Sequence, residues 1–139
     1  MAEKTRKSQI GIEYLLIVGL VVFFLISIML IAFFYSNASR DTLRMNQVEG
    51  FAMKVISSSE SVFYAGAPSK ATISTYLPEG VVDIEIIENS IVISMQTNSG
   101  ISKTSFSSKV PIEGSISTAS GIKKIKIEAI QDKVLIGNA

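Results

Sequence analysis

The chain has 139 residues and a formal net charge of +1 at pH 7, so it has room for one hydrophobic segment and one modest domain. That charge balance gives no electrostatic case for nucleic-acid binding. The sequence contains neither Cys nor His, which excludes disulfides, thiol nucleophiles, histidine acid–base chemistry and the usual zinc ligands.

Residues 1–8, MAEKTRKS, form a short basic leader. Three basic residues, Lys4, Arg6 and Lys7, stand against one acidic residue, Glu3. Positive charge beside a first apolar segment favours keeping that end of the chain in the cytoplasm. We therefore expect the part beyond the apolar segment to be exported.

Residues 9–35, QIGIEYLLIVGLVVFFLISIMLIAFFY, predict a transmembrane helix. The 22 residues from Tyr14 to Tyr35 carry no charge, and as a helix they reach roughly 33 Å, which spans a hydrocarbon core. A secretory signal has an apolar core of roughly 7 to 15 residues followed by a small-residue cleavage site. This run is longer and no such site follows it, so we expect the helix to be retained in the mature protein.

The string Lys7–Leu16, KSQIGIEYLL, resembles the class III signal peptide of archaeal type IV pilins, in the group whose processing motif is Gln-x-Ser-x-Glu before an apolar helix. The resemblance implies that a prepilin peptidase cuts between Ser8 and Gln9 and leaves the apolar helix on the subunit. Glu13 then becomes the fifth mature residue. The chain departs from the family pattern at three positions, each by a small or conservative exchange: Gly11 for Ser, Ser8 for Gly and Ile17 for Leu.

The resemblance also implies a function and a set of partners. It predicts a pilin, inserted in the cell membrane as a prepilin and then polymerised through its apolar helix, together with other pilin subunits, into an extracellular adhesive pilus. An assembly ATPase and a membrane platform protein would drive this step. The sequence contains no evident catalytic constellation, so we expect no enzymatic activity and no cofactor.

Glu13 has two interpretations. A carboxylate at the edge of the apolar run reaches headgroups and water, and it is favoured beside a helix N-terminus. Alternatively, cleavage exposes the Gln9 α-amine one helical turn away, and the resemblance implies that Glu13 neutralises this amine on its own or a neighbouring subunit. If the N-terminal Gln cyclises to an uncharged ring, that partner is lost.

Residues 36–65 predict a continuation of the helix as an amphipathic segment. The segment lacks Pro up to residue 64, and Gly50 marks a weak point or a kink. Asn37 begins the triplet Asn-Ala-Ser, which is a candidate N-glycosylation site. The apolar residues of segment 36–65 recur at the spacing of one helix face: Val48, Phe51, Ala52, Val55, Ile56, Val62 and Phe63.

Residues 70–139 predict a small exported antiparallel β-domain of six or seven strands. A turn cluster at residues 65–69 should end the helix, and apolar residues then alternate with polar ones. The expected strands are 71–77, 81–87, 90–96, 101–107, 112–118, 122–130 and 134–136. Six residues of the second and third strands are candidates for the buried face: Val82, Ile84, Ile86, Ile91, Ile93 and Met95.

About 70 residues make a marginal β-domain when isolated. We therefore predict that it packs on the exported half of the helix through Val55, Ile56, Val62 and Phe63, giving an α+β fold. The carboxylates on alternating strand positions predict a solvated outer face, and no serine has an evident base. These carboxylates are Asp83, Glu85, Glu88, Glu113, Glu128 and Asp132.

Two function classes stay open at the level of sequence. One is a pilin subunit, major or minor. The other is a single-pass membrane-anchored binding or accessory protein that never polymerises. The sequence predicts no catalytic, cofactor-binding or metal-binding residues in either case.

Overall fold

The computed structural model describes the backbone of residues 2–139 and the side chains of residues 10–36 and 39–139. One helix, α1 (Ala2–Ala65), is followed by seven strands. The chain divides into two compact units, Met1–Ser39 (unit 1) and Arg40–Ala139 (unit 2). Unit 2 combines the C-terminal part of α1 with all the strands, which confirms the predicted α+β class.

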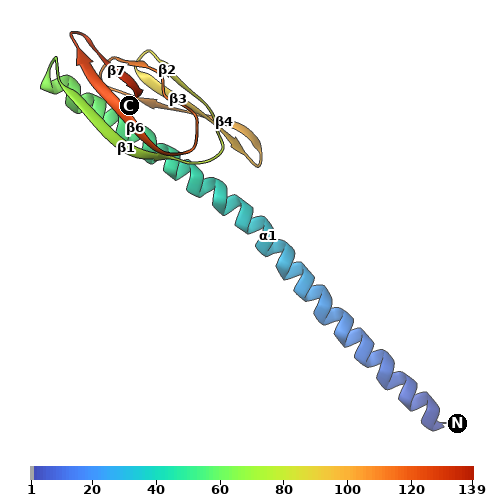
Figure 1. Ribbon diagram of the computed structural model, residues 1–139. Helices are drawn as coiled ribbons and strands as arrows, with labels where there is room; N and C mark the ends of the chain where they lie inside the picture. The colour runs from blue at the N-terminus through green and yellow to red at the C-terminus, as the bar shows by residue number, and fades with distance from the viewer. Residues whose placement is uncertain (1) are drawn as a thin grey trace. The chain divides into compact units, whose positions relative to one another are not determined.

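The strands of unit 2 form two sheets (Figure 1). A four-stranded sheet has the order β1-β6-β7-β5 and a three-stranded sheet the order β2-β3-β4. The three strands of the smaller sheet thus lie in the chain between β1 and its hydrogen-bonded partner β6. The bounds are β1 Lys70–Leu77, β2 Val81–Ile87, β3 Ser90–Thr97, β4 Gly100–Ser107, β5 Ile112–Gly114, β6 Gly121–Ile130 and β7 Lys133–Asn138.

Helix α1 ends where the turn cluster predicts. Gly66 follows the last helical residue with φ at 82°, a left-handed conformation that glycine adopts without steric cost. Its amide donates a hydrogen bond to the Phe63 carbonyl at 3.0 Å, which satisfies one of the carbonyls left free at a helix end. Gly50 does not interrupt the helix, because α1 is continuous across it.

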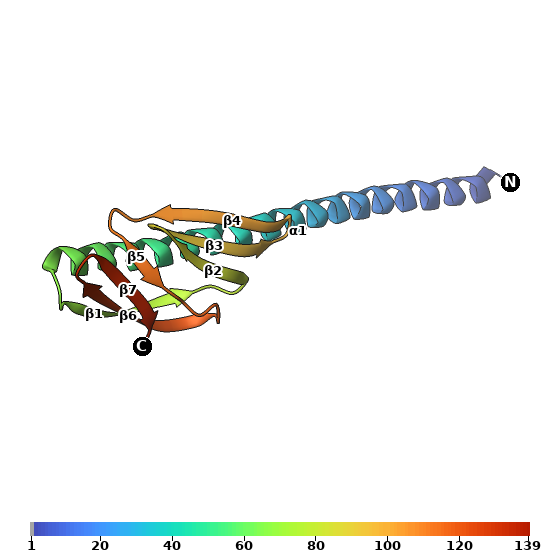
Figure 2. The same ribbon diagram turned by 90° about the horizontal axis from the view of Figure 1, so that it is seen from above.

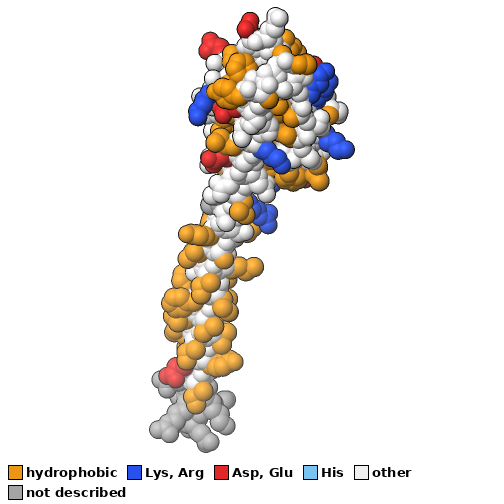
Figure 3. Space-filling model, turned by 90° about the vertical axis from the view of Figure 1, so that its left-hand side faces the viewer, with side chains coloured by type: hydrophobic (Ala, Val, Ile, Leu, Met, Phe, Trp, Pro, Cys, Tyr) orange, Lys and Arg blue, Asp and Glu red, His pale blue; other side chains and the backbone are white. Residues whose placement is uncertain are grey.

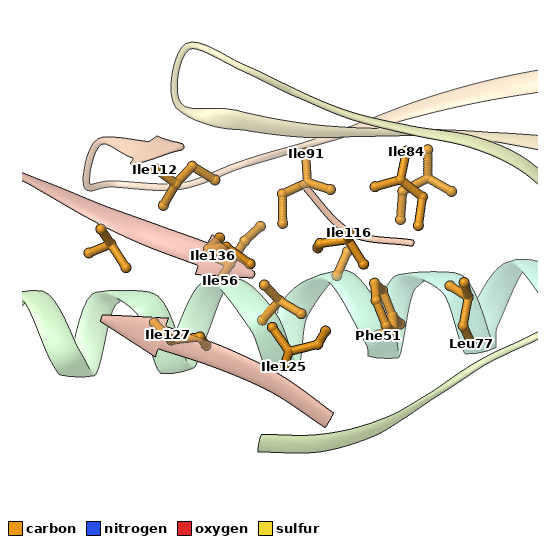
Figure 4. Packing of buried hydrophobic residues seen from close by; sticks show 14 of the residues in the cluster. Phe51, Ile56, Leu77, Ile84, Ile91, Ile112, Ile116, Ile125, Ile127 and Ile136 are labelled. Carbon is orange, nitrogen blue, oxygen red and sulfur yellow. The ribbon is translucent and has the colours of Figure 1, made fainter. Parts of the chain in front are cut away.

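The predicted apolar face of α1 packs into the core of unit 2. Six of its seven residues are buried, and Phe63 is partly buried against the same cluster. Figure 2 shows this part of α1 running beside the strands, and Figure 4 shows isoleucines of both sheets in one cluster with Phe51 and Ile56 of the helix. The predicted packing through Val55, Ile56, Val62 and Phe63 is therefore confirmed.

One of the predicted inward positions on β2 is wrong. Val82 is 52% exposed, whereas Val81 packs against the core in its place. The reason is a register shift between Val81 and Asp83, where β2 pairs with β3. An extra residue at such an irregularity moves the neighbouring side chains to the opposite face of the sheet. The predicted alternation of buried and exposed residues resumes at buried Ile84.

The predicted strand 112–118 is also too long. β5 ends at Gly114, whose φ is 135° and whose position lies against the backbone of Ile136. Ile116 then leaves the ladder, yet its side chain is buried in the core. β5 pairs with β7 in parallel, so the fold is not purely antiparallel as predicted.

Candidate functional site

The helix of unit 1 presents apolar side chains on all sides. From Ile10 to Tyr35 its large hydrophobic residues are between 41% and 79% exposed, and no part of its most apolar 18-residue window is buried. Figure 3 shows these side chains along the face turned to the viewer. The helix is long and apolar enough to cross a membrane. A helix that is hydrophobic all round needs lipid or other apolar helices around it.

The polar groups within this apolar stretch are few and suit an apolar environment. The Ser27 hydroxyl donates a hydrogen bond to the Phe23 carbonyl at 2.8 Å, one turn earlier in the same helix. Bonded in this way, a hydroxyl makes its hydrogen bond without water. Glu13 is the one charged residue in the sequence from Ile10 to Ser36.

Glu13 lies near the beginning of this stretch with its side chain exposed. The backbones of Gln9 and Glu13 belong to the same continuous helix, so the two residues are one turn apart. The side chains of the predicted processing residues Ser8 and Gln9 lie outside the described residues. The same holds for the predicted glycosylation residue Asn37, which is about 36 Å from Glu13 along an ideal helix and belongs to no common site with it.

Polar contacts hold α1 to the strands of unit 2. The Asp41 carboxylate accepts a hydrogen bond from the Asn98 amide at 3.1 Å, and the Glu60 carboxylate accepts one from the Lys109 amide at 3.1 Å. The Lys54 ammonium donates to the Ser74 carbonyl at 2.7 Å. The contact of Asp41 could not be predicted from the sequence, because a partner 57 residues away leaves no local signal.

Glu128 is a carboxylate whose titration is changed by the fold. Lys70 donates a hydrogen bond to it at 2.8 Å, and Lys126 lies 3.4 Å from its other oxygen. The hydrogen bond from Lys70 is the main cause that lowers the pKa of the Glu128 carboxyl below its ordinary value, against a smaller opposing effect of burial. All three side chains lie at the sheet surface, where such pairs contribute little to stability.

The remaining carboxylates that were predicted to form a solvated face are exposed: Asp83, Glu85, Glu88, Glu113 and Asp132. Among the described residues, no three metal-ligating side chains come together. A shallow depression at the end of the four-stranded sheet is lined by Ser117, Lys123, Lys124 and Asn138, and it is open to solvent. The most unusual feature of the described chain therefore remains its unburied apolar helix.

Comparisons with protein-family profiles, curated proteins and solved structures return no match for this chain.

Proposed function

We propose that this chain is a type IV pilin subunit: a membrane-inserted prepilin, cleaved before Gln9 and polymerised through its apolar helix into an extracellular adhesive pilus. The observation that carries the proposal is the helix of unit 1, which is apolar on every side and unburied from Ile10 to Tyr35. The sequence motif at the start of that helix, with Gln9 and Glu13, supplies the specific resemblance.

The architecture of unit 2 supports this proposal. Its core takes its helical residues from the segment between Val48 and Val62, all of them beyond the apolar stretch. The hydrophobicity of residues 10–35 therefore has no part in the core of unit 2. It is explained by a membrane before assembly and by the helices of other subunits afterwards.

The direct test is mass spectrometry of the mature N-terminus in the native membrane and in material sheared from cells. The proposal expects a chain that begins at Gln9, either with a free amine or cyclised. An intact N-terminus at Met1 would contradict processing and favour the alternative, a single-pass membrane-anchored binding or accessory protein. Recovery of the chain in sheared filaments, and its abundance there, then separates a major from a minor pilin.

Glu13→Gln is the matched test of the charge. It keeps the shape of the side chain and removes the one carboxylate in the apolar stretch, so insertion into the membrane should be unchanged or improved. Loss of filaments with normal membrane levels is expected if the carboxylate neutralises the Gln9 amine during assembly. Glu49→Gln, which changes an exposed carboxylate of α1 in unit 2, is the control and should assemble normally. Normal filaments from Glu13→Gln would show that the charge is dispensable.

A further inference from the structure

Two exposed rows of side chains in unit 2 carry opposite charges. The first, which we call the basic row, consists of Ile122, Lys124 and Lys126 on β6. All three are exposed, whereas Ile125, between the two lysines, and Ile127, after them, are buried. The basic row therefore lies on the outer face of the four-stranded sheet. Tyr76 of β1, half-exposed, is the cross-strand neighbour of Ile122 and widens its apolar end.

The second row, which we call the acidic row, consists of Ile87, Glu85 and Asp83 on β2. All three are exposed, while Ile84 between the two carboxylates is buried. Their partners on β3 keep a regular register from Asp83 to Ile87. The acidic row therefore lies on the outer face of the three-stranded sheet.

The two rows match in spacing as well as in charge. Alternate residues on a strand are about 7 Å apart, so each row has an apolar residue at one end and two like charges at about 7 Å intervals. If the strands of two copies run in opposite directions, Ile122 meets Ile87, Lys124 meets Glu85 and Lys126 meets Asp83. Every position then faces its complement.

Most of these charges form no ion pair with another described residue of their own subunit. Among the described residues, Lys124, Glu85 and Asp83 form no ion pair, and Lys126 shares Glu128 with the closer Lys70. The chain has 13 basic and 12 acidic residues, of which three and two precede Arg40, so unit 2 carries ten of each. On the side of unit 2 seen in Figure 3, basic and acidic side chains are both exposed at the surface.

We propose that the basic row of one copy docks on the acidic row of a second copy of this chain. A contact between two different patches of the same subunit leaves one patch free on each partner, so further copies can be added until the chain of subunits closes as a ring or extends as a filament. The inference extends the proposed function, because it supplies a lateral contact between the β-bearing units of a filament. It commits to a second copy because the chain itself carries both complementary surfaces.

Charge reversal in the full chain tests the contact in cells. Lys124→Glu and Glu85→Lys should each lower the yield of sheared filaments on the order of tenfold or more, since like charges then face each other. The chain carrying both exchanges should recover most of the yield, because the pair is restored with its signs swapped. Lys109→Glu and Asp132→Lys change exposed charges outside the two rows and are the matched controls. Equal yields from all variants, with membrane levels unchanged, would overturn the inference and leave the pilin proposal standing.

Cross-linking tests the same contact without requiring a filament. The chain contains no Cys, so each copy can be given a single thiol. One tagged copy carries Lys124→Cys and a second, differently tagged copy carries Glu85→Cys, and the two thiols lie close together if the rows meet. Treatment of cell membranes with a short bifunctional maleimide should give mixed dimers, since a facing Lys and Glu hold their Cβ atoms further apart than the about 4 Å that a disulfide bridges. Mixed dimers no more abundant than those from Lys124→Cys with Asp132→Cys would refute the docking. Mixed dimers from a chain that keeps Met1 and forms no filaments would uphold it and refute the pilin proposal.

Discussion

The C-terminal part of α1 should be indispensable for the folding of the strands that follow it. It contributes five large side chains to the core of unit 2: Val48, Phe51, Val55, Ile56 and Val62. Full burial of such side chains is worth about 1.5 to 3 kcal/mol each, so together they supply a gross stabilisation of about 7 to 15 kcal/mol. This is comparable with the whole net stability of a typical domain, about 5 to 15 kcal/mol.

Two fragments test this dependence. A fragment of residues 40–139 should be soluble without the apolar stretch and should unfold cooperatively in urea, as followed by circular dichroism. A fragment of residues 66–139 should be unfolded or insoluble. A cooperative transition from the shorter fragment, with a midpoint near that of the longer one, would refute the reasoning.

Single substitutions in the longer fragment set the scale. Phe51→Ala removes a buried ring and should lower the free energy of unfolding by about 3 to 5 kcal/mol. Met53→Ala changes a residue two positions away whose side chain is exposed, so it should change that free energy by less than about 0.5 kcal/mol. Equal effects of the two substitutions would show that the helix does not pack on the strands through the Phe51 face.

Three further predictions concern the same fragment. Gly114→Ala should destabilise it by at least the roughly 1 to 3 kcal/mol that backbone strain costs, because a Cβ there meets the Ile136 backbone at a positive φ. Gly137→Ala has open space around its Cβ and should be far milder. Equal melting temperatures of the two variants would refute this. Gly50→Ala should stabilise by up to about 1 kcal/mol, because the helix is continuous and nothing blocks a Cβ; a lower urea midpoint would contradict it. The pKa of Glu128 is lowered on folding, so its contribution is present above the ordinary carboxyl pKa and is lost as pH falls through the folded value. Glu128→Gln should therefore flatten the acid side of the stability profile slightly, and an unchanged slope would refute the role of the lysine pair.

The features that the sequence predicts correctly are those with a local period. The apolar face of α1 between Val48 and Phe63 recurs every three or four residues because one side of the helix is buried. The alternation along β3 is equally local, with Ile91, Ile93 and Met95 all buried. The end of the helix at Ala65 was predictable because glycine and proline cannot easily continue it.

The features that the sequence does not predict depend on partners distant in the chain. The exposure of Val82 depends on a register shift against β3. The parallel pairing of β5 joins Ile112 to Val134 through a strand of three residues, too short to show a period. The role of Glu13 is harder still, because the amine proposed to meet it can belong to another subunit.

The apolar helix alone cannot direct the assembly proposed here. Lipid tails are about as apolar as leucine side chains, so moving residues 10–35 from a bilayer to a bundle of like helices brings little hydrophobic gain. Specificity must then come from polar terms that change between the two environments. Glu13 is such a term at the start of the helix, because a carboxylate that leaves the interface needs a cation. The basic and acidic rows of unit 2 are a second polar term, since their charged groups give up contacts with water for contacts with each other only when two copies meet. Added salt should therefore weaken lateral contacts between copies before it affects the retention of the helix in membranes.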